Sequence, residues 1–271
     1  MPLRRYQSMK IMGKILKYSF YDLMRSRWSY VYFVFYLALG FVLLFLNHDL
    51  SKAVITMMNV IMILVPLIGT IFGVMYFYNS REFTELLLAL PLKRSTIFLG
   101  QYLGVAISLT LSLVLGLGIP FVLYGLFLSD AIWNFTLLLT TGAFLTFIFT
   151  ALAFNIALVN ENKIKGFGYA VLMWLFLAVI FDGLFLLSLI IFEQYPLDKF
   201  SLIATMFNPI DLSRILILLK LDISALLGYT GAVFKKFFGT NFGFFISMGV
   251  LLVWTLVPIW MLTLFSRKKD F

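Results

Sequence analysis

Six apolar runs, each long enough to cross the hydrocarbon core of a bilayer, constrain this chain more than any other feature. They cover residues 28–46, 54–78, 97–124, 132–159, 167–192 and 242–265. In lipid, a spanning segment must form its backbone hydrogen bonds internally, which a helix achieves over about 20 residues. The alternating segments of about 10 residues that form barrel strands are absent. The runs therefore predict an all-α membrane protein with six transmembrane helices.

Composition supports the same fold class. The chain is 62% hydrophobic and 12% charged, whereas soluble domains are about 45–50% apolar and about 25% charged. With 271 residues, the six spans leave little chain for a separate soluble domain. We therefore predict one transmembrane domain over residues 1–271. Its parts are a cytoplasmic amphipathic helix (1–27), spans one to five (28–192), an outer loop (193–241), span six (242–265) and a cytoplasmic tail (266–271).

The chemistry available to this domain is restricted. The chain contains no cysteine and a single histidine, His48, which excludes disulfides, thiolate metal sites and any multi-histidine metal site within one chain. The P-loop pattern GxxxxGK[ST] and the hydrolase patterns HExxH and GxSxG are also absent. We expect no catalytic residue, no metal and no cofactor in this chain.

The distribution of basic residues predicts the orientation in the membrane. Six spans place both termini on one side, and all but six of the 21 Lys and Arg residues fall on that side. The positive-inside rule then assigns both termini to the cytoplasm. Anionic lipid explains the net charge of +9, so we expect a lipid partner and no nucleic acid.

Residues 10–27 have the pattern of an amphipathic helix that precedes span one, rather than of a cleavable signal peptide. One predicted face is basic: Lys10, Lys14, Lys17, Tyr21 and Arg25. The other is apolar: Met12, Leu16, Phe20 and Leu23. Such a helix would lie in the headgroup plane. The alternative is a disordered basic tail.

The cytoplasmic loop between spans two and three, residues 79–96, contains a second amphipathic segment. Its apolar residues Phe83, Leu86, Leu87 and Leu90 recur at helical spacing. Glu82 and Glu85 favour the start of a helix through its dipole, and Pro91 ends it. This helix needs a cover, either a groove on a partner protein or the lipid surface. The short polar loop 160–166 could be a second, smaller contact.

The outer loop, residues 193–241, contains apolar stretches at 210–221 and 225–234. Asp211 and Arg214 interrupt the first stretch and make a further span unfavourable. Asn208–Pro209 is a suitable helix start. We predict two short helices in or on the outer leaflet, covered by the spans, by lipid or by an outside partner.

Asp182 lies near the middle of span five, where a carboxylate is unfavourable unless it is protonated, paired or facing water. No basic residue lies at comparable depth in any span. Two interpretations remain open: a group that senses substrate or contacts a partner, and a neutral acid in a structural hydrogen bond. The Gly100 and Gly104 pair in span three is a weak signal for close helix packing.

The loop between spans two and three resembles one in the membrane subunits of ABC-2-type ABC transporters. The resemblance rests on the sequence Arg81-Glu-Phe-Thr-Glu-Leu-Leu-Leu-Ala-Leu-Pro91-Leu-Lys-Arg94-Ser, followed by Leu99-Gly-Gln-Tyr102. Phe83-Thr84 departs from the family's usual Gly-Thr. The resemblance implies two copies of the chain and a separate cytoplasmic ATPase. The residues expected to contact that ATPase are Glu82, Phe83, Glu85, Leu86, Leu87 and Arg94.

Other segments resemble the NosY branch of that family, the permeases that serve maturation of nitrous oxide reductase. They include Gly166-Phe-Gly-Tyr-Ala, Phe181-Asp-Gly-Leu and Asn208-Pro-Ile-Asp-Leu-Ser-Arg214. The branch implies a periplasmic accessory protein, with Asp211 and Arg214 as contact residues, and a sulfur species as cargo. The alternatives are a non-transporting scaffold that transmits ATPase motion to a periplasmic protein and, less favoured, a secondary transporter.

Overall fold

The computed structural model describes residues 2–47, 50–192, 194–195, 197–220, 236 and 240–268, and the regular elements within these residues are all helical. Six helices are long and apolar enough to cross a membrane: Arg27–Asn47, Leu50–Asn79, Arg94–Leu123, Ile132–Val159, Lys163–Ile191 and Phe242–Arg267. The predicted all-α fold with six spans is confirmed. Each predicted end lies within a few residues of the observed one.

Five of these spans are the helices α2 (Arg27–Asn47), α3 (Leu50–Asn79), α5 (Arg94–Leu123), α6 (Ile132–Val159) and α12 (Asn241–Lys268). The fifth span in chain order consists of α7 (Lys163–Leu175), a π-helical turn at Phe176–Ile180, and α8 (Phe181–Ile191). A π turn widens the helix and often marks a functional position. Here it directly precedes Asp182.

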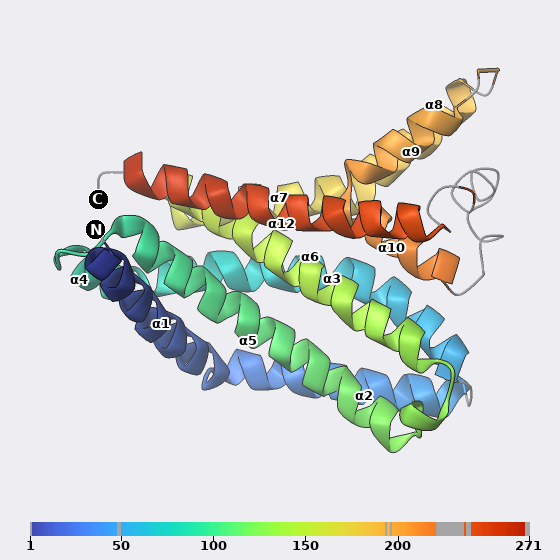
Figure 1. Cartoon of the computed structure of the whole chain (residues 1–271), viewed down its shortest axis with the longest axis horizontal. Helices are drawn as coiled ribbons and strands as arrows, with labels where there is room; N and C mark the ends of the chain where they lie inside the picture. Colours follow the sequence, from blue (N-terminus) through green and yellow to red (C-terminus); the bar gives the residue numbers. More distant parts are fainter. Residues whose placement is uncertain are drawn as a thin grey trace.

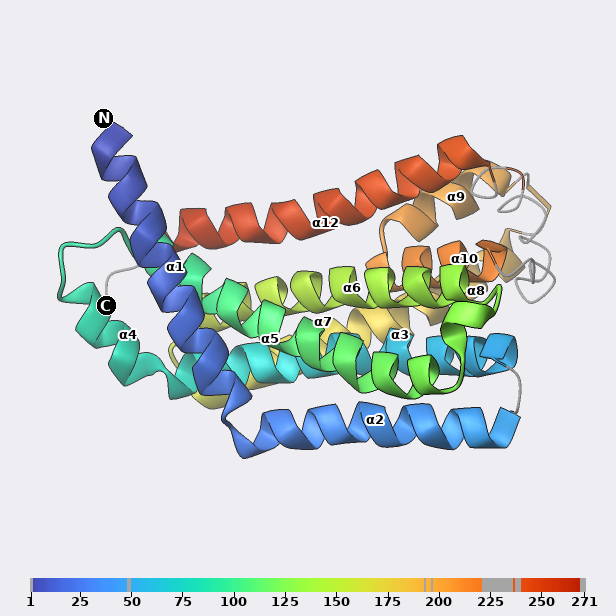
Figure 2. The same ribbon diagram turned by 60° about the horizontal axis from the view of Figure 1, so that its bottom comes forward.

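The spans form a bundle with α6 at its centre (Figures 1 and 2). In the most apolar 18-residue stretch of α6, 67% of the residues are buried, whereas in that of the fifth span only 11% are buried. In Figure 1, α8 diverges from the bundle together with α9 (Asp198–Met206), and no residue of α8 is buried. The lipid-facing surface is therefore concentrated on the peripheral spans.

The N-terminal helix α1 (Pro2–Met24) begins earlier than the predicted Lys10 and packs along α5 (Figure 2). Its basic face is exposed as predicted. Among residues 9–24, whose burial is described, it buries Ile15, Ser19 and Leu23, spaced four apart. Of the predicted apolar face only Leu23 is buried; Met12, Leu16 and Phe20 are half-buried, because the contact with α5 follows the Ile15 ridge.

Glycines on α5 permit this close approach. A Cβ atom at Gly104 would lie 2.6 Å from the Ser19 Cβ and 2.8 Å from the Leu16 carbonyl oxygen. At Gly100 it would lie 2.9 Å from the Ile15 Cβ. The Gly100 and Gly104 pair therefore packs α1 onto the start of α5, which is the role that small residues four apart have in membranes.

Between the fifth span and α12, the described chain forms a bent helix pair. The helix α9 is followed by α10 (Pro209–Lys220), and the axis bends by 115° between the segments 199–206 and 209–219. The predicted start of a helix at Asn208–Pro209 is confirmed, since the Asn208 Oδ1 accepts a hydrogen bond from the Ile210 amide at 3.0 Å. The spans α3, α6 and α12 cover α10. The predicted helix at 225–234 lies outside the described residues.

Candidate functional site

A short helix, α4 (Arg81–Leu88), lies outside the bundle between α3 and α5, at the same end as α1 and the last turn of α12 (Figure 1). The prediction placed this helix at 82–90. It carries Glu82 in its first turn, where a negative charge stabilises the helix dipole. It ends three residues before Pro91, and the chain enters α5 at Arg94, which is half-buried.

The outer face of α4 is apolar at its centre and acidic at its start. Leu86 is 71% exposed, and Leu90, just beyond the helix, is 52% exposed. Glu82 and Glu85 are also exposed. Glu85 accepts a 2.9 Å ion-pair contact from the Arg81 Nε on the same helix, which stabilises an exposed helix by only about 0.3–0.5 kcal/mol. An exposed leucine that follows two exposed acidic residues is available for contact with another protein.

The inner face of α4 is held by two other helices. The Phe83 ring stacks on Tyr18 of α1, with ring centroids 4.3 Å apart. The buried Thr84 hydroxyl donates to the Ser80 carbonyl and accepts from the Gln101 Nε2 of α5, both at 2.8 Å. Gln101 is fully buried. A displacement of α4 therefore pulls on both α1 and α5.

The six residues predicted to contact an ATPase differ in how accessible they are. Glu82, Glu85 and Leu86 are exposed, Leu87 and Arg94 are half-buried, and Phe83 contacts Tyr18 within the chain. Tyr18, Thr84 and Gln101 also support α4, and none of them is among the residues predicted for this site. Helical spacing does not pair residues of different elements, and no local signal links Thr84 to Gln101.

The loop at 160–162 lies beside the end of α3, and that end of α3 directly precedes α4 in the chain. The Tyr78 hydroxyl donates to the Asn160 carbonyl at 2.7 Å, and the Lys163 Nζ donates to the Asn79 Oδ1 at 3.0 Å. The Asn162 side chain caps α7 by accepting from two backbone amides. This loop is therefore fixed beside the last residues of α3, which directly precede α4, and its role as a second, smaller contact stays a prediction.

A cluster of polar side chains lies between α8 and α10. The Arg214 Nη1 donates to the Asp182 Oδ2 at 2.9 Å and to the Asp211 Oδ1 at 3.3 Å. The Asn208 Nδ2 donates to the Asp211 Oδ2 and to the Leu177 carbonyl, both at 2.8 Å. The cluster therefore joins the bend between α9 and α10 to the π turn of the fifth span.

This cluster explains how Asp182 is accommodated. The sequence contains no basic residue at its depth in any span, but Arg214 reaches it from α10, which is not one of the six spans. One guanidinium faces two carboxyl groups, and burial together with the neighbouring Asp182 raises the pKa of the Asp211 carboxyl to about 8, which reduces the excess of negative charge near neutral pH. The side chains of Arg214, Asp182 and Asp211 are 28%, 30% and 10% exposed. Contact of Asp211 and Arg214 with an outside protein stays a prediction, while their present contacts lie within the chain.

The comparisons with known proteins point to one class. No protein-family profile matches the chain. Over 151 residues the chain is 28% identical to a protein of Stutzerimonas stutzeri named "Probable ABC transporter permease protein NosY". The chain is distantly related to an ABC transporter permease. The match includes 54% of this chain and 51% of that protein, so the chain spans about half the length of the curated relative.

Proposed function

We propose that this chain is the membrane subunit of an ABC transporter and that α4 docks into a groove on a separate ATPase. The observation that carries the proposal is the exposed Leu86, with Glu82 and Glu85 beside it, on a helix whose inner face is attached to α1 and α5. A leucine at this exposure is solvent-accessible apolar surface that a groove on a partner would cover. ATP hydrolysis is then expected from the partner.

The proposed orientation places α1, α4 and the loop at 160–162 in the cytoplasm of a bacterial inner membrane. The described residues at this end carry most of the exposed Lys and Arg, including Lys14, Lys17, Arg25 and Lys93. At the opposite end the described exposed cations include Lys52 and Lys199. This asymmetry supports the orientation through the positive-inside rule.

Transmission would proceed through packed contacts. When ATP binding closes a pair of ATPase subunits, α4 would move with them, and the Thr84–Gln101 hydrogen bond and the Phe83–Tyr18 stack would carry that motion to α5 and α1. The 30-residue α5 is about 45 Å long and would move as a rigid body to the opposite end of the bundle. Two copies of the chain would enclose the path between them.

The cargo and the outside partner belong to the same proposal. The NosY resemblance supports a sulfur species for the copper–sulfur cluster of nitrous oxide reductase and a periplasmic accessory protein. The scaffold alternative predicts nucleotide-dependent movement without solute. Inside-out vesicles that contain the complex discriminate between the two, because a scaffold shows no ATP-dependent change in the solute content of the vesicles.

The docking experiment uses Leu86→Asp. Leu86 is mostly exposed, so the substitution leaves the bundle intact, yet it places a carboxylate in the proposed groove. With a tagged candidate ATPase subunit from the same organism co-expressed, we expect the yield of the co-purified complex to fall at least tenfold. Leu128→Asp is the matched control, since Leu128 is 96% exposed at the opposite end of the bundle. Equal recovery of Leu86→Asp and Leu128→Asp would refute the docking of α4.

A further inference from the structure

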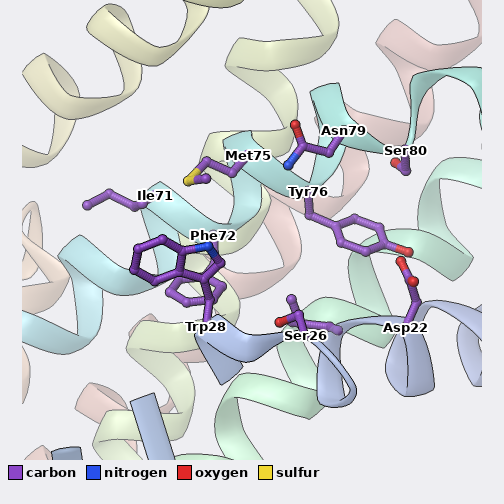
Figure 3. A pocket seen from close by; sticks show the side chains of 10 residues that line it. Asp22, Ser26, Trp28, Ile71, Phe72, Met75, Tyr76, Asn79 and Ser80 are labelled. Carbon is purple, nitrogen blue, oxygen red and sulfur yellow. The ribbon is translucent and has the colours of Figure 1, made fainter. Parts of the chain in front are cut away.

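A cavity of about 440 Å³ opens between the end of α1, the start of α2 and the last turns of α3 (Figure 3). This volume falls in the range of about 300–1,000 Å³ typical of small-ligand sites. Part of its wall is formed by the exposed Trp28 and by three half-buried residues, Ile71, Phe72 and Met75. The cavity is therefore open to the outer surface of the bundle. The side chains that attach α4 to α1 and α5, Phe83 with Tyr18 and Thr84 with Gln101, do not line this cavity.

The wall changes from polar to apolar along the cavity. Asp22, Asn79 and Ser80 line it where α1 and α3 end, and Ile71 and Phe72 line it deeper along α3. Asn79 lies eight positions after Ile71 in the helix, a distance of about 12 Å along the helix axis. This is the order of a lipid headgroup region followed by the upper part of an acyl chain.

A buried hydroxyl in the wall has polar neighbours but no well-formed hydrogen bond. Tyr76 is 7% exposed, and in the described part of the chain its hydroxyl meets no partner at full hydrogen-bond geometry, although the Ser19 hydroxyl and the Asp22 carboxylate lie nearby. Figure 3 shows the hydroxyl directed toward the Asp22 carboxylate. Since a buried, unpaired hydroxyl is unfavourable, a ligand that supplies a hydrogen bond here would be stabilised.

The charge of the wall selects the ligand. Asp22 is the charged side chain that lines the cavity, and it is the one acidic residue among residues 1–27. A carboxylate beside a hydroxyl favours a primary ammonium, which carries three N–H donors. Arg25 and Arg27 follow within five residues and are exposed, so a phosphate next to the ammonium would also find cations.

We propose that this cavity binds a phospholipid whose headgroup carries a primary ammonium, as phosphatidylethanolamine does. The ammonium contacts Asp22 and the Tyr76 hydroxyl, the phosphate lies toward Arg25 and Arg27, and the first part of an acyl chain lies on Phe72. Asn79 and Ser80 directly precede α4, so the bound lipid supports the segment from which α4 begins.

The test measures lipid retention and does not depend on an ATPase. The purified chain is incorporated into phosphatidylcholine nanodiscs, phosphatidylethanolamine is titrated in, and retained lipid is counted by native mass spectrometry. We expect one tightly held phosphatidylethanolamine per chain, with at least tenfold preference over phosphatidylcholine and phosphatidylglycerol. Tyr76→Phe removes only the hydroxyl and should weaken retention about three- to tenfold. Asp22→Asn should weaken it at least tenfold.

Asp130→Asn is the matched control, because Asp130 is an exposed carboxylate that lines a different cavity, between α6 and α12. It should retain lipid like the unmodified chain. Equal retention of the three lipids, or unchanged retention in both Tyr76→Phe and Asp22→Asn, overturns the proposal. Displacement of the lipid by a second copy or by an ATPase also overturns it, since the cavity would then be a protein contact.

Discussion

Replacement of Arg214 by Gln tests whether the polar cluster between α8 and α10 holds the fold in the membrane. Two unit charges about 4 Å apart attract by about 4 kcal/mol at an effective dielectric constant of about 20. Arg214 and Asp182 retain 28% and 30% side-chain exposure, so screening reduces the coupling to about 2 kcal/mol. Since removal of Arg214 also leaves two partly buried carboxyl groups without a counter-charge, we expect Arg214→Gln to lower the free energy of unfolding by about 2–4 kcal/mol.

A double-mutant cycle isolates the ion pair. Asp182→Asn alone should cost about 1–2 kcal/mol, because Arg214 keeps its contact with Asp211. Combined with Arg214→Gln, it should cost about 2 kcal/mol less than the sum of the two single variants. The measurement is reversible unfolding in mixed micelles with increasing dodecyl sulfate, together with hydrogen exchange of peptides from α10.

Lys199→Gln controls for the loss of a positive charge, because Lys199 is an exposed residue of the neighbouring α9. It should change the free energy of unfolding by less than about 0.5 kcal/mol. If the costs of Arg214→Gln and Asp182→Asn add to within about 0.5 kcal/mol, the two groups are not coupled and the reasoning is wrong.

Two further perturbations address the contacts that support α4. Gly104→Ala would place a methyl group against α1 and should lower the free energy of unfolding by about 1–3 kcal/mol. Gly118→Ala on the same helix has nothing within 4 Å of the added methyl group and should be neutral in the same unfolding assay; equal effects would contradict the close packing of α1 on α5. Gln101→Leu removes the hydrogen bond to Thr84, worth about 1 kcal/mol, and should accelerate hydrogen exchange in α4 about fivefold. Unchanged exchange would mean that Gln101 does not hold α4.

The sequence predicted much of α4 and little of its attachment. Glu82, the leucines and Pro91 locate the helix within two residues, because dipole and backbone preferences act between near neighbours in the chain. The contact of Phe83 with Tyr18 joins residues 65 positions apart, and no periodicity carries that information. Helical spacing alone places Phe83 on the apolar face with Leu86 and Leu87, whereas in the structure its ring stacks on Tyr18 of α1; its contact with an ATPase stays a prediction.

The N-terminal helix shows the same division on a smaller scale. Its exposed basic face follows from the preference of charged side chains for water, and the sequence located that face correctly. Its buried ridge through Ile15 and Ser19 depends on the glycines of α5, which allow a serine to lie against the backbone. A hydrophobicity pattern does not select a serine as a contact residue.

The number of spans, the helical class and the approximate ends of each span were determined by the sequence alone, because transfer of each apolar run into lipid depends mainly on its own side chains. The tertiary structure decided which polar groups meet. Asp182 and Arg214 lie 32 residues apart, and Arg214 comes from a segment whose charges argued against a span. Only the fold of α10 back against α3, α6 and α12 brings its guanidinium to the carboxylate. The free energy of that pair depends on distance in space, which local sequence does not encode.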